Sequence, residues 1–238
     1  MSITELPPVA GCRLWQVDLD TAPAPRTAAA LSAHEGERAR RFVFERDGDR
    51  FVAVHAALRD ALSQLAGIPA ALLDFTQGPF GKPALAQPST LRFNLSHCQS
   101  VALIAVCEQA DVGADVELLR AMPDADALAL ACFTGSEHRA LCEVAPEARD
   151  RAFLTCWTRK EACLKATGTG LSIDTRSFEV GIAPDDREIE LVGVHGVLRL
   201  ALSSFVAAHG AVCAVARVLP AEAALASSPA AETGGVFA

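Results

Sequence analysis

Apolar and polar positions recur at two periods along the chain, and the two periods follow each other in a regular order. Residues 49–67 (DRFVAVHAALRDALSQLAG) carry apolar side chains at helical spacing, and Gly67 followed by Ile-Pro predicts the end of that helix. Residues 71–76 (ALLDFT) are strand-like, and residues 77–83 (QGPFGKP) predict a turn. Residues 90–107 (TLRFNLSHCQSVALIAVC) then predict two apolar strands joined by a polar turn.

The second half of the chain repeats this order. Residues 150–168 predict a helix that ends at Gly168, residues 177–182 (SFEVGI) predict a strand, and residues 196–218 predict a pair of strands. The repetition predicts an α/β (α+β) fold, a pseudo-twofold pair of similar lobes. Each lobe is expected to be a small, mostly antiparallel sheet packed on a long helix, with ligand bound where the lobes meet.

The expected organisation has three parts. Residues 1–108 form the N-terminal lobe and residues 109–220 the C-terminal lobe. Residues 221–238 are rich in small side chains and are expected to be a flexible tail.

Composition narrows the class of protein. The 238 residues are 51% hydrophobic and 21% charged, which is typical of a globular chain with a core of its own. No apolar run approaches the roughly 20 residues that cross a bilayer, and the start of the chain does not resemble a signal peptide. The eight cysteines have no C-x-x-C pair and no zinc-type spacing. We therefore expect reduced cysteines and a cytoplasmic protein without a membrane span.

The charge is distributed unevenly. A formal net charge of −8 argues against a general nucleic-acid binder. Even so, six arginines crowd one short stretch of the first half: Arg38, Arg40, Arg41, Arg46, Arg50 and Arg59. Such a cluster suits a phosphate-bearing ligand or an acidic partner. The alternative is a solvated amphipathic helix whose arginines are balanced by neighbouring acids.

Lysine is rare in this chain. It occurs at Lys82, Lys160 and Lys165, while all the other members of the 21 basic Lys and Arg residues are arginine. These positions are candidates for sites that need a compact ammonium group rather than a planar guanidinium. The alternative is that Lys160 and Lys165 are ordinary solvated helix positions.

Asp115 and Glu117 stand two residues apart in a largely apolar, strand-like run at residues 111–119 (DVGADVELL). Alternation places Asp115 and Glu117 on the same face of a strand. Burying two adjacent carboxylates is costly unless a cation neutralises them, and hard oxygen ligands of this type suit Mg²⁺. The alternative is an exposed edge strand that carries solubilising acids.

A helix after this strand carries further candidates. Trp157, Glu161 and Lys165 are spaced i, i+4, i+8 and share one face. Glu161 suits a third metal ligand or a general base, and Lys165 suits a phosphate contact; an ordinary i, i+4 ion pair between them is the alternative. Lys160 faces elsewhere and is expected to be structural or to lie at the rim of the site.

Residues 81–83 (GKP) and 94–98 (NLSHC) add Lys82 in a turn and a histidine near a strand end. Adjacent strand residues point to opposite faces, so His97 is not expected to activate Ser96 as a nucleophile. A histidine that contacts phosphate is the better functional interpretation of His97.

Taken in order, GKP (81–83), FNLSH (93–97), VGADVE (112–117) and WTRKEACLKATGTGL (157–171) resemble the 4'-phosphopantetheinyl transferases of the two-lobed, surfactin-synthetase-activating class. The resemblance runs from about residue 31 to residue 218 and includes the arginine-rich ERARRF (37–42). It implies transfer of 4'-phosphopantetheine from coenzyme A to a serine of an acyl or peptidyl carrier protein, with release of 3',5'-ADP.

The resemblance also implies roles for individual residues. Asp115, Glu117 and Glu161 would bind Mg²⁺, Glu161 would take the serine proton, and Lys165 would hold the pyrophosphate. The coenzyme A site would be lined by Arg38, Arg50, Lys82, Ser96, His97 and Lys165. The chain departs from the family pattern at Glu35, Cys98 and Ala114, and Glu35 stands where relatives often carry a basic residue.

Two other functions remain open at this point: a Mg²⁺-dependent nucleotide phosphohydrolase, and a protein that binds coenzyme A without catalysis. The expected carriers belong to fatty-acid, polyketide or nonribosomal peptide synthesis, and two fused lobes make a monomer the expected state.

Overall fold

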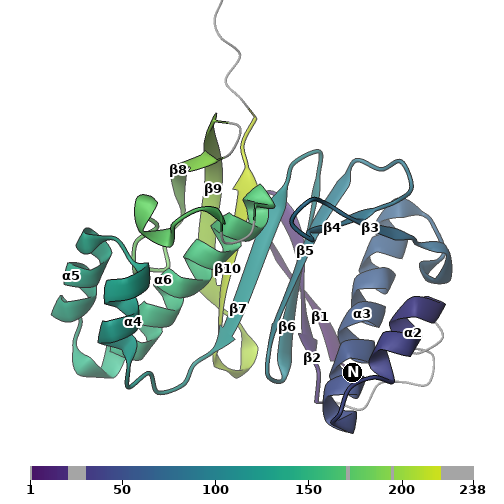
Figure 1. Cartoon of the computed structure of the whole chain (residues 1–238), viewed down its shortest axis with the longest axis horizontal. Helices are drawn as coiled ribbons and strands as arrows, with labels where there is room; N and C mark the ends of the chain where they lie inside the picture. The colour runs from purple at the N-terminus through teal and green to yellow at the C-terminus, as the bar shows by residue number, and fades with distance from the viewer. Residues whose placement is uncertain (1, 21–30, 170–171, 194–195, 221–238) are drawn as a thin grey trace, which may run out of the picture.

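The computed structural model describes residues 2–20, 31–169, 172–193 and 196–220 (Figure 1). The predicted tail at residues 221–238 lies outside these ranges. Helices α4, α5 and α6 occupy the left of Figure 1 and α3 the right, with two antiparallel sheets between them. No helix in the described part of the chain combines the length and the apolar character that a membrane crossing needs.

The N-terminal lobe is a four-stranded sheet in the order β1-β2-β6-β5, in which every neighbouring pair is antiparallel. The long helix α3 packs on one face of this sheet. The elements are β1 (Ser2–Val9), β2 (Cys12–Asp18), α2 (Ala33–Ala39), α3 (Glu45–Ala66), the 3-10 turn η1 (Ala70–Leu72), β3 (Phe75–Gln77), β4 (Pro83–Leu85), β5 (Leu91–Cys98) and β6 (Val101–Glu108).

The C-terminal lobe has a second antiparallel sheet, in the order β7-β10-β9-β8, packed on the long helix α6. Its elements are β7 (Val112–Leu118), α4 (Ala125–Cys132), α5 (Gly135–Glu143), α6 (Pro146–Thr167), the 3-10 turn η3 (Thr175–Ser177), β8 (Arg187–Gly193), β9 (Gly196–Val206), η4 (Ala208–Gly210) and β10 (Ala211–Val218).

The two lobes share one topology. In each lobe a strand leads to a 22-residue helix and then to a strand pair, and the last strand of that pair lies beside the first strand. The equivalent strands stand in the orders β2-β6-β5 and β7-β10-β9. The predicted pair of similar lobes, each with an antiparallel sheet on a long helix, is confirmed.

Strand β6 shows why both faces of its sheet are apolar. Ala102, Ile104 and Val106 belong to the core under α3, whereas Leu103 and Ala105 belong to a second core that also contains residues of β7 and β10. The two sheets therefore pack against each other, and the molecule has four layers: α3, sheet, sheet, α6. We call the core between the two sheets the seam; it consists of Cys12, Leu14, Val101, Leu103, Ala105, Cys107, Val112, Ala114, Val116, Ala211, Cys213 and Val215.

Both long helices end where the sequence predicts. Gly67 and Gly168 stand at their carboxyl ends with φ of 68° and 67°. This left-handed conformation has no steric cost for glycine, which makes glycine the usual residue that ends a helix.

The strand predicted at residues 177–182 is wrong. The segment begins at the last residue of η3, and no described strand pairs with it; side chains bind its backbone instead. Glu137 accepts hydrogen bonds from the amides of Val180 and Gly181, and Lys160 donates to the carbonyl of Phe178. The strand-like prediction for residues 71–76 is only partly right, since η1 comes first and β3 begins at Phe75.

Candidate functional site

The site begins where β7 crosses α6 with almost no space between the two backbones. A Cβ atom on Gly113 would lie 2.0 Å from the carbonyl oxygen of Ala162 and 2.3 Å from the amide nitrogen of Ala166. Only glycine permits this approach. The contact brings the next residue on the same face of β7, Asp115, against the side of α6 that carries Lys165.

Asp115, Lys165 and Ser96 form a closed hydrogen-bonded group. The Lys165 ammonium lies 2.5 Å from Asp115 Oδ1 and 2.9 Å from Ser96 Oγ, and Ser96 Oγ donates to the same carboxylate oxygen at 2.8 Å. Burial raises the pKa of Asp115, while Lys165 and Ser96 favour the ionised form. The three residues come from β7, α6 and β5, so both lobes contribute.

Glu117 lies two residues further along the same face of β7, as the alternation predicts. Its carboxylate accepts a hydrogen bond from Arg120 at 2.6 Å and lies 3.0 Å from the Sγ of Cys98. Ser96 and Cys98 are also two residues apart, so β5 presents one side chain to each carboxylate of β7.

Glu161 lies on α6 one turn before Lys165. Among the residues that the structure describes, none forms a hydrogen bond or ion pair with its carboxylate. The alternative i, i+4 pair with Lys165 is not formed, because the ammonium group binds Asp115 instead. Burial raises the pKa of Glu161, and so do the charges of Asp115 and Glu117.

The chemistry of this carboxylate set fits a hard divalent cation. Asp115, Glu117 and Glu161 offer only oxygen ligands, and the nearby cations are Lys165 and Arg120. The three carboxylates do not yet converge within 4.8 Å of one another as a set. Lys165 sits directly against Asp115, where a cation would bind, so an incoming ion would share or displace that contact.

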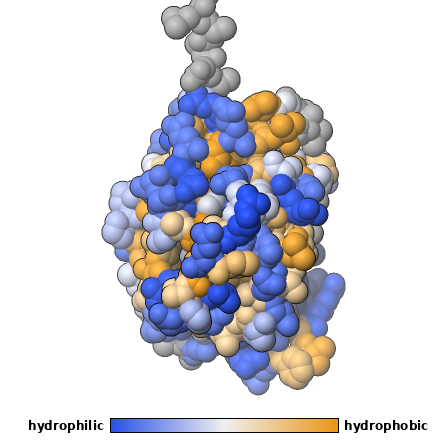
Figure 2. Space-filling view, turned by 90° about the vertical axis from the view of Figure 1, so that its left-hand side faces the viewer, coloured by the Kyte–Doolittle hydropathy of each residue, from blue (hydrophilic) through white to orange (hydrophobic). Residues whose placement is uncertain are grey.

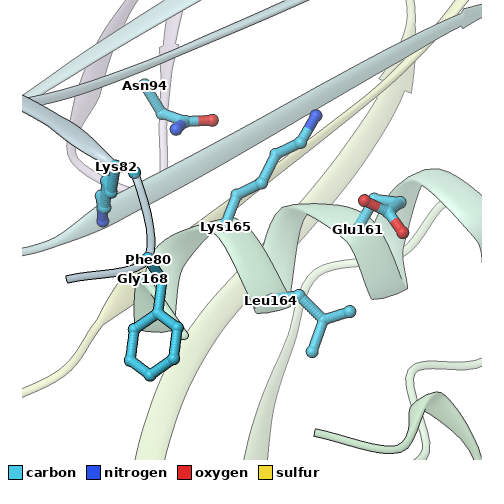
Figure 3. Close-up of a pocket in the computed structure, with 8 residues that line it drawn as sticks. Phe80, Lys82, Asn94, Glu161, Leu164, Lys165 and Gly168 are labelled. Atoms are coloured by element: carbon cyan, nitrogen blue, oxygen red, sulfur yellow. The ribbon is translucent and has the colours of Figure 1, made fainter. Parts of the chain in front are cut away.

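A cavity of about 270 Å³ opens beside these residues. Figure 3 shows Glu161 and Lys165 projecting from α6 at this cavity, with Asn94 and Lys82 contributed by the other lobe. Its remaining lining comes from the turn at Phe80 and Gly81 and from the end of α6: Phe80, Gly81, Leu164 and Gly168.

A second cavity, of about 670 Å³, lies in the N-terminal lobe. Gly81 lines both cavities, so the turn after β3 separates them. The larger cavity is lined in part by basic and aromatic side chains: Arg38, Arg50, Phe51, His55 and His97. Burial lowers the pKa of His97, and the positive charges of Lys165, His55 and Arg50 add to this effect.

The predicted basic residues differ in how free they are to meet a ligand. Arg38 stacks over the ring of Phe51 and has no carboxylate partner among the described residues. Arg50 is paired with Asp20 through Nε and Nη2. Lys82 donates to Asp111 at 3.2 Å and to the carbonyl of Ala166 at 2.9 Å, so its ammonium group links the two lobes.

Sequence comparison connects this geometry to known proteins. The family model of the 4'-phosphopantetheinyl transferase superfamily matches residues 111–216, and the model of the N-terminal domain of a 4'-phosphopantetheinyl transferase matches residues 22–109. The 4'-phosphopantetheinyl transferase HetI of Nostoc sp. is 36% identical over 178 residues, which cover 73% of this chain and 75% of that protein. A 4'-phosphopantetheinyl transferase of Bacillus subtilis is 30% identical over 171 residues, or 71% of this chain and 75% of the relative.

This chain belongs to the 4'-phosphopantetheinyl transferases. The family that the motifs suggested from sequence is thereby confirmed.

Glu35 of the transferase has a structural role. It is the acidic partner in the capping box of α2 with Ser32, and its carboxylate binds Arg59 and His55. Burial acts against ionisation, but the hydrogen bonds from His55 and Ser32 and the charge of Arg59 lower the pKa of Glu35 to about 2. Its charge is therefore already compensated at the point where the sequence departs from the family pattern.

Lys160 of the transferase has a structural role. The sequence predicted either this role or a position at the rim of the site, and the structure shows the first. Its side chain is fully buried and binds Glu137 at 2.8 Å together with the carbonyls of Thr175 and Phe178. Ser96 and His97 face opposite sides of β5, as predicted: Ser96 meets Asp115, and His97 lines the larger cavity.

Sequence reasoning missed two polar residues of the site. Asn94 lines the smaller cavity, and its side-chain oxygen accepts a hydrogen bond from the amide of Ala114 at 2.9 Å. Strand alternation from Ser96 would have found it, since the two residues are two positions apart. Arg120 binds Glu117 from beyond the end of β7, and its position three residues after Glu117 gave no comparable signal.

Proposed function

We propose that this transferase moves 4'-phosphopantetheine from coenzyme A to a serine hydroxyl of an acyl or peptidyl carrier protein, with Mg²⁺, and releases 3',5'-ADP. The observation that carries the proposal is the set of Asp115, Glu117 and Glu161 beside a cavity to which both lobes contribute. Phosphoryl transfer depends on positioning and on charge stabilisation, and these residues are suited to both tasks.

Asp115, Glu117 and Glu161 are the residues that would hold the metal ion. Mg²⁺, when bound there, would polarise the pyrophosphate and offset the negative charge that develops on the leaving group. Lys165 adds a second positive charge at the same point, and Ser96 keeps it oriented toward Asp115. Ser96 and Lys165 would therefore position the phosphates from the side of the cavity that faces β5.

Glu161 is proposed as the base. In the transfer the serine oxygen forms a bond to the β-phosphorus, the bond from that phosphorus to the oxygen of the 3',5'-ADP portion breaks, and the serine proton must leave. The carboxylate of Glu161 has a raised pKa and no hydrogen-bond partner within the described ranges of the chain, so it is well suited to accept this proton.

The larger cavity supports a site for the nucleotide end of coenzyme A. Its volume of about 670 Å³ lies in the range of small-molecule sites, and the guanidinium groups of Arg38 and Arg50 line it. His97, whose pKa is lowered by burial, would contact the ligand as a hydrogen-bonding ring. We assign Arg38 the leading role toward the 3'-phosphate, because its guanidinium is not paired with any carboxylate of the residues that the structure describes. Arg50 keeps one terminal nitrogen outside its pair with Asp20. Lys82 would contact the ligand from the smaller cavity.

The division of labour follows the lobes. The N-terminal lobe, residues 1–108, would bind the nucleotide, and the C-terminal lobe, residues 109–220, would supply the metal ligands and the base. One chain carries all of the proposed residues, so a monomer is sufficient for the reaction. We propose the cytoplasm as its compartment.

Intact-mass analysis of an apo carrier protein incubated with the transferase, coenzyme A and Mg²⁺ tests the proposal. A gain of one phosphopantetheine, with 3',5'-ADP in the supernatant, is the expected result, and omission of Mg²⁺ should abolish it. Release of the nucleotide without modification of the carrier would indicate a phosphohydrolase. Coenzyme A binding with neither product would indicate a binding protein.

A further inference from the structure

A second cluster of ligand-type side chains lies on α4 and α5, apart from the residues discussed so far. Asp126 stands in the first turn of α4, and His138 and Cys142 are one turn apart on α5. Asp126 Oδ1 lies 2.9 Å from His138 Nε2 and 3.6 Å from Cys142 Sγ, and Cys142 Sγ lies 3.7 Å from His138 Nε2. In the part of the chain that the structure describes, this is the one set of three such groups within 4.8 Å of one another.

The distances match the edges of a tetrahedral metal site. Bonds of about 2.0–2.1 Å from zinc to oxygen or nitrogen and about 2.3 Å to sulfur imply ligand separations of about 3.3–3.6 Å at tetrahedral angles. The two separations that involve sulfur fit this range closely. The Asp126–His138 contact is at present a hydrogen bond, and it would open by about 0.4 Å when an ion replaced the shared proton.

We propose that Asp126, His138 and Cys142 bind a borderline-soft divalent cation of the Zn²⁺ class. Thiolate and imidazole ligands select such ions over Mg²⁺, which prefers oxygen. Three protein ligands leave the fourth position to water or to an incoming group. Binding would replace the thiol proton of Cys142, and the hydrogen that a neutral His138 carries on Nε2 would be exchanged for one on Nδ1. One proton is therefore released for each ion bound.

The cluster is accessible to ions. Asp126 and Cys142 are exposed, and the side chain of His138 is 22% exposed. Figure 2 views the molecule from the side of α4 and α5, and hydrophilic residues cover much of this face. An ion can reach the cluster without any movement of the core.

The two helices that carry the ligands are firmly held. The capping box of Thr134 and Glu137 fixes the start of α5, and Glu137 is itself anchored by the amide of Val180 and the ammonium group of Lys160. Ala125 and Ala129 of α4 are buried in the core. The three ligand atoms therefore meet because the backbone positions them, which lowers the cost of ordering a site.

The local charges also favour a cation. The Asp126 carboxylate faces both His138 Nε2 and Cys142 Sγ, and its negative charge attracts a cation to the three ligand atoms. The charge of Arg149 acts on both Asp126 and Cys142, but its guanidinium is held by the carbonyls of Cys142 and Val144. It faces the backbone at the end of α5 and leaves the three ligand atoms open.

No sequence pattern indicates this site. Zinc sites are usually found from pairs of cysteines or histidines at short spacings. Here one cysteine and one histidine share α5, and the aspartate lies on α4, twelve residues before the histidine. Only the packing of α4 on α5 brings the third ligand into place.

Titration of the full chain with Co²⁺, in the presence of excess Mg²⁺, tests the proposal. A bound thiolate gives a sulfur-to-cobalt charge-transfer band, which a carboxylate site cannot produce. We expect one equivalent of Co²⁺ with this band and its displacement by Zn²⁺. Absence of the band would overturn the proposal.

Matched variants locate the ion. Cys142→Ser should abolish the band, and His138→Gln should weaken the affinity by at least about 10-fold. Cys98→Ser is the control, because Cys98 is the thiol beside Glu117 at the other carboxylate set. A band that survives Cys142→Ser but is lost in Cys98→Ser would place the ion at Glu117 and overturn the assignment.

Thermal unfolding gives a readout that does not depend on absorption. Zn²⁺ should raise the melting temperature of the parent chain and of Cys98→Ser, because the ion links α4 to α5 only in the folded state. It should have no such effect on His138→Gln. An equal shift in His138→Gln would contradict the proposed ligand set even if Cys142→Ser did not fold.

Discussion

Two lysine–carboxylate pairs lie one and a half turns apart on α6, and their surroundings differ completely. Lys160 pairs with Glu137 in the core of the C-terminal lobe, where the two side chains are 0% and 1% exposed. Lys165 pairs with Asp115 between the lobes, where the lysine side chain is 30% exposed. Both pairs join a rare lysine to a single acidic residue, so residue type alone cannot tell them apart.

The two pairs differ in whether all of the charged groups around them have partners. Around Lys160 the charges cancel, and the spare donors and acceptors bind backbone groups of residues 175–181. Around Lys165 the carboxylates outnumber the nearby cations, and Glu161 has no partner in the described part of the chain. A buried pair that is complete holds the fold, whereas an incomplete set beside a cavity can still bind a ligand.

The largest expected effect is a loss of transfer rate when Glu161, in the carboxylate set around Lys165, is replaced. Glu161→Gln keeps the shape of the side chain but cannot take a proton, so the rate of carrier modification should fall by about 10²–10⁴-fold. Loss of an anionic metal ligand should add to this. Coenzyme A binding and the circular dichroism spectrum should stay close to those of the parent.

Glu147→Gln is the matched control for this variant. Glu147 is exposed in the first turn of α6, so its replacement should leave the rate unchanged. A Glu161→Gln protein that transfers at the parental rate would show that another group accepts the proton.

The next effect is on stability and should separate the two lysines. Lys160→Met leaves Glu137 buried without its cation and should lower the free energy of unfolding by about 3–5 kcal/mol. Lys165→Met should cost less, because Lys165 is 30% exposed and Ser96 still donates a hydrogen bond to Asp115, but it should reduce the transfer rate. Urea unfolding and a rate assay on both variants measure the contrast.

Equal loss of stability in the two lysine variants would remove the distinction drawn here. The double variant Lys160→Met, Glu137→Leu provides a further check. It should recover part of the stability lost in Lys160→Met, since neither charge is then buried alone.

A smaller effect is expected on the affinity for a ligand of the larger cavity. Dephospho-coenzyme A lacks the 3'-phosphate and should bind more weakly than coenzyme A by about 1.5–3 kcal/mol, the usual contribution of a hydrogen bond to a charged group. Calorimetry measures the difference, which Arg38→Gln should reduce. Arg13→Gln is the control, because Arg13 pairs with Glu5 and lines neither cavity. Equal affinity of the parent for both ligands would remove the 3'-phosphate site.

The smallest effect concerns acid stability. Burial opposes ionisation of Glu137, but Lys160 and the amides of Val180 and Thr134 lower its pKa below the ordinary 4.5. At acid pH the unfolded chain then binds the proton more readily, so this contribution is complete above pH 4.5 and is lost as the pH falls below it. The loss is at most about 1.4 kcal/mol per pH unit.

Urea unfolding at several pH values should reveal this contribution as a slope. The parent should lose stability below pH 4.5 more steeply than the double variant Lys160→Met, Glu137→Leu. Parallel slopes would mean that Glu137 titrates normally in the folded state.

The sequence predicted the parts of the fold that depend on local pattern. The helices ending at Gly67 and Gly168, and the strand pairs after them, follow directly from periodicity and from glycine at the helix ends. It missed β1, β2, β8, α4 and α5. Strand β1 is largely exposed and lacks a clear apolar alternation, whereas the capping box of Thr134 and Glu137 is a local signal for α5 that apolar periodicity does not capture. The false strand at 177–182 had the right composition, but its backbone is bound by Glu137 and by lysine and arginine side chains of α6.

The candidate site could be predicted as a set of residues but not as a geometry. Strand and helix spacing placed Asp115 with Glu117 and Glu161 with Lys165. Nothing in the spacing indicated that Lys165 would bind Asp115 rather than Glu161, or that Lys82 would bind across the lobes to Ala166. Those contacts depend on how β5, β7 and α6 meet in three dimensions.

The seam between the two sheets has a consequence for how substrate enters. Each lobe buries an apolar sheet face of the other. If the chain were split at the loop between β6 and β7, each half would expose this apolar face and would tend to aggregate. For the same reason the two lobes do not form a hinged pair, because separating them would expose Leu14, Leu103 and Val215 to water. Any ligand of the two cavities must therefore bind while the two sheets stay packed against each other.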